Sequence, residues 1–114
     1  MGDETMKVLI IDGQGGGLGR QLVSAVKEYD RNIEVLAVGT NSAATNTMLR
    51  AGADQAATGE NSVVVASARA DVIMGPVGIV IADSMLGEIT PRMAVAGGQG
   101  SAKRILVPVN LCDN

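Results

Sequence analysis

Apolar segments typical of strands alternate along the chain with segments whose apolar residues recur every three or four positions. Residues 7–12 and 33–38 fit strands, and between them residues 18–26 place leucines and valines on one face of a helix. This helix is expected to end near residues 30–32, where polar residues cluster. The chain therefore begins as strand, helix, strand.

A second helix is expected after the second strand. Asn41 or Ser42 caps its start, and Gly52 stands just past its end. A short third strand at residues 53–57 comes next. The polar turn at residues 58–62 then leads into a third helix, which continues the alternation.

The middle of the chain is less regular. The third helix is expected to run to residue 70, and residues 71–74 form a fourth strand. Two interpretations stay open for residues 75–87. Pro76 suits the first position of a helix, whereas the β-branched residues at 79–81 favour an extended chain or a hairpin return.

The last part of the chain gives clearer signals. Thr90 before Pro91 is a strong helix start, because threonine caps a helix and proline suits its first position. Residues 103–107 form the last strand, and Pro108, which lacks an N–H, marks its end or places it at a sheet edge. The alternation predicts the α/β class, as a three-layer Rossmann-like domain with a mainly parallel sheet of about five strands.

The length of the chain limits its organisation. Its 114 residues suffice for a single domain, 1–114, and leave no room for a separate substrate domain. Residues 1–6 are acidic and poor in apolar side chains, so we expect a flexible leader outside the fold. Within the domain we expect the strand order 3-2-1-4-5.

The hydrophobic fraction of the chain is high, at 46%, and its mean hydropathy is positive. Charged residues nevertheless interrupt every apolar run before it is long enough to span a bilayer. We therefore expect a soluble, cytoplasmic protein with no membrane partner. Because so apolar a composition leaves apolar surface on a small domain, we also expect a homodimer.

Several classes of chemistry lack the residues they need. The chain has no histidine and one cysteine, Cys112, so Ser-His-Asp triads, zinc sites and internal disulfides are excluded, and no metal site is expected. The net charge is −3, the lysines and arginines are scattered, and Tyr29 is the only aromatic residue. Because a basic stripe and a base-stacking platform are both missing, we expect no nucleic-acid partner.

The turn between the first strand and the first helix is rich in glycine, with five glycines among the seven residues from Gly13 to Gly19. Such a turn leaves backbone N–H groups uncovered at the positive end of the helix, which is a site for a phosphate or another anion. Right-handed crossovers bring the loops after the second and third strands to the same sheet edge. The predicted ligand-binding residues are Gly13, Gln14, Gly15, Gly16, Gly17, Leu18, Gly19, Thr40, Asn41, Thr58, Glu60 and Asn61.

These residues also have structural interpretations. Glycines in the first turn allow the helix to pack closely on the strand, and Asn41, Thr58 and Asn61 are good helix caps. Asp12 ends the first strand and is expected to order the glycine loop by accepting hydrogen bonds from its N–H groups.

Three functions stay open, and we favour the first. It is binding of a small phosphorylated ligand, with a nucleotide or dinucleotide as the expected cofactor. The second is a small enzyme that uses carboxylates such as Glu60, Asp83 and Glu88. Glu60 and Glu88 would each lie near a helix start, where the dipole lowers a carboxylate pKa and favours a standing anion over a general base. The third is an oligomeric interaction or scaffold subunit whose glycine loops serve packing alone. No catalytic residue is assigned.

A Gly-x-x-x-Gly-x-Gly spacing that begins at Gly13 resembles the glycine turn of the short-chain dehydrogenase family, over residues 12–23. The Tyr-x-x-x-Lys pair of that family has no counterpart, because Tyr29 is followed four residues later by Ile33. The resemblance therefore implies no dehydrogenase activity. In addition, no acid follows the second strand to hold a ribose, and no Lys-Ser or Lys-Thr follows the glycines as in a Walker loop.

Further motifs extend over most of the chain, at residues 12–19, 39–41, 58–61, 87–91 and 105–108. Together they resemble a small bacterial family of domains of unknown function, DUF3842, with a Rossmann-like fold. This resemblance implies the fold and brings no reaction with it. Similar sequences continue into a further strand beyond Asn114, so we expect the last sheet edge to be incomplete or supplied by a partner chain.

Overall fold

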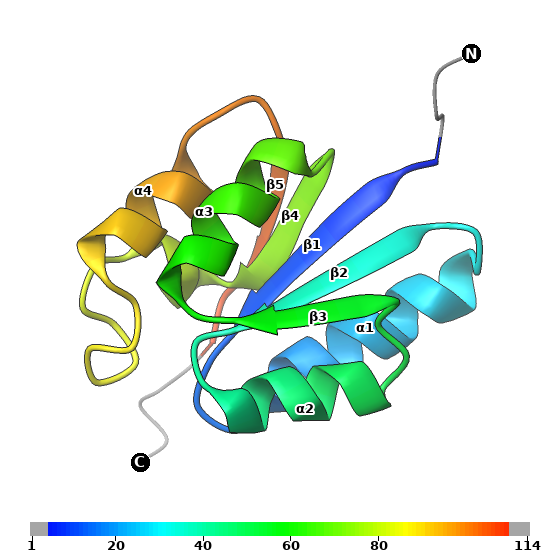
Figure 1. Cartoon of the computed structure of the whole chain (residues 1–114), viewed down its shortest axis with the longest axis horizontal. Helices are drawn as coiled ribbons and strands as arrows, with labels where there is room; N and C mark the ends of the chain where they lie inside the picture. Colours follow the sequence, from blue (N-terminus) through cyan, green and yellow to red (C-terminus); the bar gives the residue numbers. More distant parts are fainter. Residues whose placement is uncertain (1–4, 110–114) are drawn as a thin grey trace.

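Five parallel strands form one sheet in the order β3-β2-β1-β4-β5 (Figure 1). The computed structural model describes residues 5–109, and every element named below lies within that range. The strands are β1 (Lys7–Asp12), β2 (Glu34–Gly39), β3 (Gln55–Thr58), β4 (Val72–Pro76) and β5 (Lys103–Val107). The predicted class and strand order are confirmed.

Helices cover both faces of this sheet, which makes the fold a three-layer, Rossmann-like α/β arrangement (Figure 1). The helices are α1 (Gly17–Tyr29), α2 (Ser42–Arg50), α3 (Glu60–Arg69) and α4 (Pro91–Gly98). Helices α1 and α2 pack on one face, and α3 and α4 pack on the other. No helix in the described part of the chain is long and apolar enough to cross a membrane.

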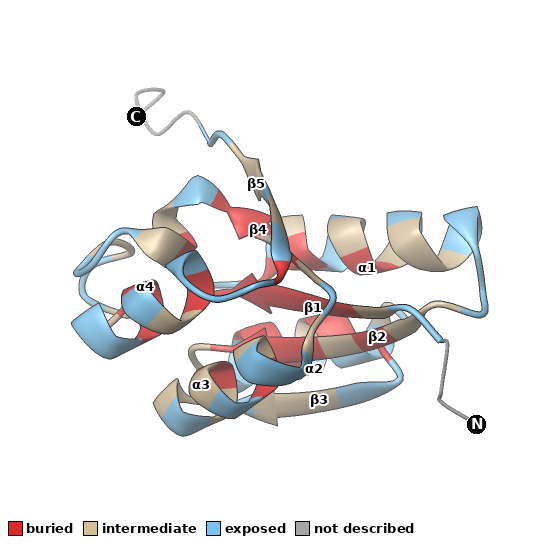
Figure 2. Cartoon of the chain, turned by 90° about the horizontal axis from the view of Figure 1, so that it is seen from above, coloured by how far each residue is buried: buried red, intermediate tan, exposed pale blue. Residues whose placement is uncertain are grey.

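The central strand β1 supplies both halves of the core. Val8 and Ile10 pack toward α1 and α2, whereas Leu9 and Ile11 pack toward α3 and α4. Successive side chains of a strand point to opposite faces, so a strand covered on both faces has an uninterrupted apolar run, here Val8 to Ile11. Figure 2 shows the buried residues gathered where the sheet meets the helices.

Two predicted helix starts are confirmed. The Asn41 side chain accepts a hydrogen bond from the Ala44 N–H at 2.9 Å, and the Thr90 hydroxyl accepts one from the Met93 N–H at 3.1 Å. Gly52, just past α2, has a φ of 118°, which glycine adopts without strain.

The start of α3 differs from the expected caps. Gly59 occupies the N-cap position without a side-chain hydrogen bond, and Asn61 lies inside the first turn. The Thr58 hydroxyl is not a cap, because it forms a 2.7 Å hydrogen bond with the Thr45 hydroxyl of α2. A tertiary contact therefore replaces the local one that the sequence favoured.

The segment between β4 and α4 follows neither open interpretation. Strand β4 extends to Pro76, and a single 3₁₀ turn at Val77–Val80 follows it. Ile79 is 1% exposed, so this apolar residue anchors a turn in the core and does not extend a strand. A run of turns then leads to α4.

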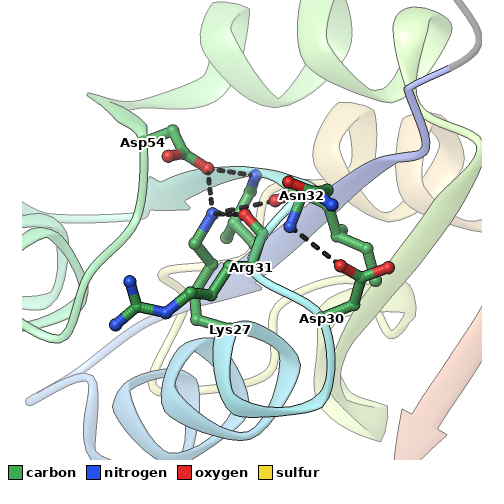
Figure 3. Close-up of polar contacts among 7 residues, drawn as sticks. Lys27, Asp30, Arg31, Asn32 and Asp54 are labelled. Carbon is green, nitrogen blue, oxygen red and sulfur yellow. Dashed lines mark hydrogen bonds and ion pairs between the residues drawn. The ribbon is translucent and has the colours of Figure 1, made fainter.

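Lys27 of α1 links the segments that lead into β2 and β3, at the amino ends of these strands (Figure 3). Its ammonium donates to Asp54 Oδ2 and to the Ile33 carbonyl, both at 2.8 Å, and to the Arg31 carbonyl at 3.2 Å. The same Asp54 oxygen accepts from the Val35 N–H at 2.8 Å. The Lys27 hydrogen bond, followed by the Val35 N–H, lowers the pKa of Asp54 below its usual value.

The start of the described chain contacts the sheet. The Met6 carbonyl accepts a hydrogen bond from the Glu34 N–H at 2.9 Å, so the last residue of the expected leader contacts the start of β2. The rest of that leader up to residue 4, and the expectations for Cys112 and Asn114, lie outside the described residues.

We expect Asp54→Asn to lower the free energy of unfolding by about 1 kcal/mol at pH 7, because Lys27 and Val35 lose a charged, partly exposed acceptor. A carboxylate with a lowered folded-state pKa stabilises the fold above its unfolded-state pKa, and this contribution is lost as the pH falls through the folded-state pKa. Denaturant unfolding should therefore show a difference between variant and wild type that shrinks on acidification. Glu28→Gln, which removes an exposed charge in the last turn of α1, is the control. An equal loss of unfolding free energy in both variants contradicts the role of Asp54 as the acceptor for Lys27 and Val35.

Candidate functional site

The candidate site lies at the carboxyl ends of β1 and β4. Strand order reverses between these two strands, and open α/β sheets bind ligands in the crevice at such a point. A cleft of about 310 Å³ opens there between the glycine loop and the segment after β4. Its lining residues include Gly13, Gln14, Gly15, Gly16, Gly17, Leu18, Val77, Ile81 and Met85.

Asp12, the last residue of β1, organises the glycine loop. Its carboxylate accepts hydrogen bonds from the Gly13 N–H at 2.8 Å and from the Gly19 N–H at 2.6 Å. This arrangement confirms the structural role predicted for Asp12. Burial raises the pKa of Asp12, the Gly19 and Gly13 N–H groups oppose that rise, and the nearby charge of Glu88 adds to it.

A second carboxylate, that of Glu88, reaches the loop from the segment before α4. Its Oε1 accepts from the Gln14 N–H at 2.7 Å, the Thr40 hydroxyl at 2.6 Å and the Asn41 amide at 3.3 Å. Glu88 therefore joins three of the predicted ligand-binding residues. The hydrogen bonds from Thr40, Gln14 and Asn41 lower the pKa of Glu88, in the direction predicted, although the prediction named the helix dipole as the cause.

The glycines of the loop are of two kinds. Gly16 has a φ of 77°, and a Cβ there would lie 2.9 Å from Ala44 Cα. A Cβ on Gly19 would lie 2.5 Å from the Met48 sulfur and 2.9 Å from Asp12 Cβ. Packing therefore explains glycine at these two positions, as the packing interpretation expects. A Cβ on Gly13 would meet only the ends of side chains, such as Glu88 Oε1 at 2.6 Å.

Gly15 and Gly17 carry no such requirement. Neither has a left-handed φ, both are exposed, and a Cβ on either would meet nothing within 4 Å. Within residues 5–109, the N–H groups of Gly15, Gly17 and Leu18 have no hydrogen-bond acceptor. The open part of the loop is therefore this group of three amides at the start of α1, which is narrower than the whole predicted loop.

The remaining predicted residues are turned toward other elements. Glu60 Oε2 accepts from the Thr90 hydroxyl at 2.5 Å, and Glu60 Oε1 lies 3.7 Å from an Arg92 nitrogen. Thr58 contacts α2, as described above, and Asn61 is exposed on α3. None of these three side chains forms a hydrogen bond with the glycine loop.

The apolar wall of the cleft was missed by the sequence-based prediction of the site. Val77, Ile81 and Met85 come from the segment after β4 whose conformation the sequence left open. Topology gave a usable signal, because every loop that follows a parallel strand reaches the same sheet edge. The sequence did not predict the conformation of this segment, and that conformation places the three side chains in the same cleft as the glycines.

Comparison with known families matches a domain of unknown function, DUF3842, over residues 7–114. The chain belongs to this family. Comparison with curated proteins and with solved structures finds no significant match. In the described part of the chain, no cluster of three or more Asp, Glu, His or Cys residues is arranged to hold a metal ion.

Alanine substitutions should separate the two kinds of glycine. We expect Gly16→Ala and Gly19→Ala to lower the free energy of unfolding by roughly 1 to 3 kcal/mol, because each methyl group overlaps fixed neighbours. Gly15→Ala and Gly17→Ala should leave it unchanged or raise it by up to about 1 kcal/mol, because alanine fits and restricts the unfolded chain. Denaturant titration of the four variants measures this; similar losses in all four contradict the division.

Proposed function

We propose that this protein binds a nucleotide or a similar phosphorylated small molecule, with the phosphate on the N–H groups of Gly15, Gly17 and Leu18. The observation that carries the proposal is that Gly15 and Gly17 face open space with no need for glycine in the fold itself. A bare backbone at such a position allows an outside group to approach the amides closely. The start of α1 adds the positive end of a helix dipole.

The cleft beside these amides suits the rest of such a ligand. Its volume of about 310 Å³ is at the lower end of the range for small-molecule sites. Val77, Ile81 and Met85 offer an apolar surface for a base or another planar ring. One surface therefore suits a phosphate and the adjoining surface suits a base, which are two parts of a nucleotide.

The charges around the cleft limit the kind of phosphate. Its described lining contains no lysine or arginine, and the Asp12 carboxylate is one of its walls. Sites for a nucleoside triphosphate add a lysine and a metal ion to the backbone amides. This cleft is better suited to a phosphate of low charge, such as the pyrophosphate diester of a dinucleotide.

The alternatives find less support. Glu60 and Glu88, two of the carboxylates considered for an enzyme, already accept hydrogen bonds from side chains of the protein. A homodimer and a cytoplasmic location stay predictions from composition. Binding without an assigned reaction is therefore the function that we propose.

Isothermal titration calorimetry with ADP, NAD⁺ and inorganic pyrophosphate tests the proposal. We expect at least one nucleotide to bind the wild type, and we expect the double variant Gly15→Ala/Gly17→Ala to bind it about tenfold more weakly, since two methyl groups obstruct the amides. Gly98→Ala in α4, where a Cβ makes ordinary contact with Val80 at 3.6 Å, is the matched control. If no probe binds, or if the double variant binds as tightly as wild type, the proposal is wrong.

A further inference from the structure

A carboxylate stands at the tip of β2, although the loop that follows this strand has no acidic residue. In dinucleotide-binding folds, an Asp or Glu about 20 residues beyond the glycine turn accepts a hydrogen bond from the ribose 2′-hydroxyl. Thr40 and Asn41 occupy that region here. Glu88 accepts hydrogen bonds from both of their side chains, so a distant segment supplies the missing acid.

We infer that Glu88 determines nucleotide specificity: its Oε2 accepts a hydrogen bond from a ribose 2′-hydroxyl, and its charge repels a 2′-phosphate. This inference rests on the proposed function, because it needs a nucleotide whose phosphate lies on the glycine loop. Gln14 connects the two places. Its N–H donates to Glu88, and the residue also lines the cleft.

The two oxygens of Glu88 have different environments. Oε1 takes the three hydrogen bonds from Gln14, Thr40 and Asn41, which fix the carboxylate in place. Within residues 5–109, no hydrogen bond reaches Oε2, and Glu88 is only partly buried. One oxygen therefore holds the group and the other is available as an acceptor.

The segment that carries Glu88 is held in one conformation. Asp83, Met85 and Leu86 have φ angles of 69°, 56° and 58°, a region that costs other residues more than it costs glycine. Such a backbone persists where its surroundings fix it. The Asp83 N–H donates to the Ile89 carbonyl at 2.7 Å, and Ile89 itself is 0% exposed. Burial of the residue next to Glu88 thus sets the position of the carboxylate before a ligand binds.

Glu88 is better placed to contact a ribose than to compete with a phosphate. A competing internal anion would occupy the free amides at the start of α1. Glu88 binds the Gln14 N–H instead and leaves the N–H groups of Gly17 and Leu18 without an acceptor in the described chain. Glu88 is not among the residues that line the cleft; it contacts the glycine loop at Gln14, the residue that directly precedes Gly15.

Glu88→Gln tests the inference, with NAD⁺, NADP⁺ and inorganic pyrophosphate as calorimetric probes. The amide keeps an oxygen for Gln14 and Thr40 and replaces the charged acceptor with a neutral group that also donates. We expect wild type to prefer NAD⁺ over NADP⁺ by about tenfold or more, and Glu88→Gln to lose most of this preference. Inorganic pyrophosphate, which has no ribose, reports any general effect of the lost charge on the glycine loop. Glu28→Gln, an exposed change in α1, should keep the wild-type preference.

The outcomes separate this inference from the proposal beneath it. If nucleotides bind but Glu88→Gln keeps the wild-type preference, only the role of Glu88 is wrong. If the variant binds NAD⁺ and pyrophosphate more tightly by the same factor, Glu88 is an internal competitor and the inference is also wrong. If wild type binds no probe, both the proposed nucleotide binding and the role of Glu88 are wrong. If Glu88→Gln does not fold, the test uses wild type alone and compares ADP with 2′-deoxy-ADP, which lacks the 2′-hydroxyl. We then expect ADP to bind about tenfold more tightly, and equal affinities contradict the inference.

Discussion

The carboxylate of Asp12 is the group on which the glycine loop depends. It ends the central strand β1, is 5% exposed, and accepts the N–H groups of Gly13 and Gly19 on either side of the loop. Helix α1 has no side-chain cap at Gly16, so Asp12 supplies the negative group that a helix start favours. The two N–H groups offset part of the cost of burying this carboxylate, and burial still raises its pKa. The same two hydrogen bonds hold both ends of the loop.

A second carboxylate, Glu88, ties the loop to the far part of the chain. It links Gln14 to Thr40 and Asn41, and so joins the tips of β1 and β2 to the segment before α4. The two acids use separate amides and, within residues 5–109, leave the N–H groups of Gly15, Gly17 and Leu18 without an acceptor at the start of α1. The site therefore combines free backbone donors with fixed acceptors, which suits recognition of a ligand more than turnover.

The division among the glycines connects packing with function. Gly16 and Gly19 are explained by contacts with α2, whereas a Cβ on Gly15 or Gly17 would meet no atom of the described chain within 4 Å. A purely structural account of the loop explains the first pair and leaves the second unexplained. DUF3842 is a domain of unknown function and brings no reaction with it, so we propose binding from the geometry of this loop.

The sequence by itself determined the parallel sheet, the caps at Asn41 and Thr90 and the role of Asp12, because these follow from periodicity and from hydrogen bonds between residues that are close in the chain. The strand order was correctly predicted by analogy with doubly wound folds, but no local pattern requires it. Tertiary structure alone decided that Glu88 meets Gln14 across 74 positions and that Thr58 bonds to Thr45 instead of capping α3. It also decided which glycines the fold requires. These contacts depend on where packed elements place side chains that are distant in sequence, and no local pattern records that distance.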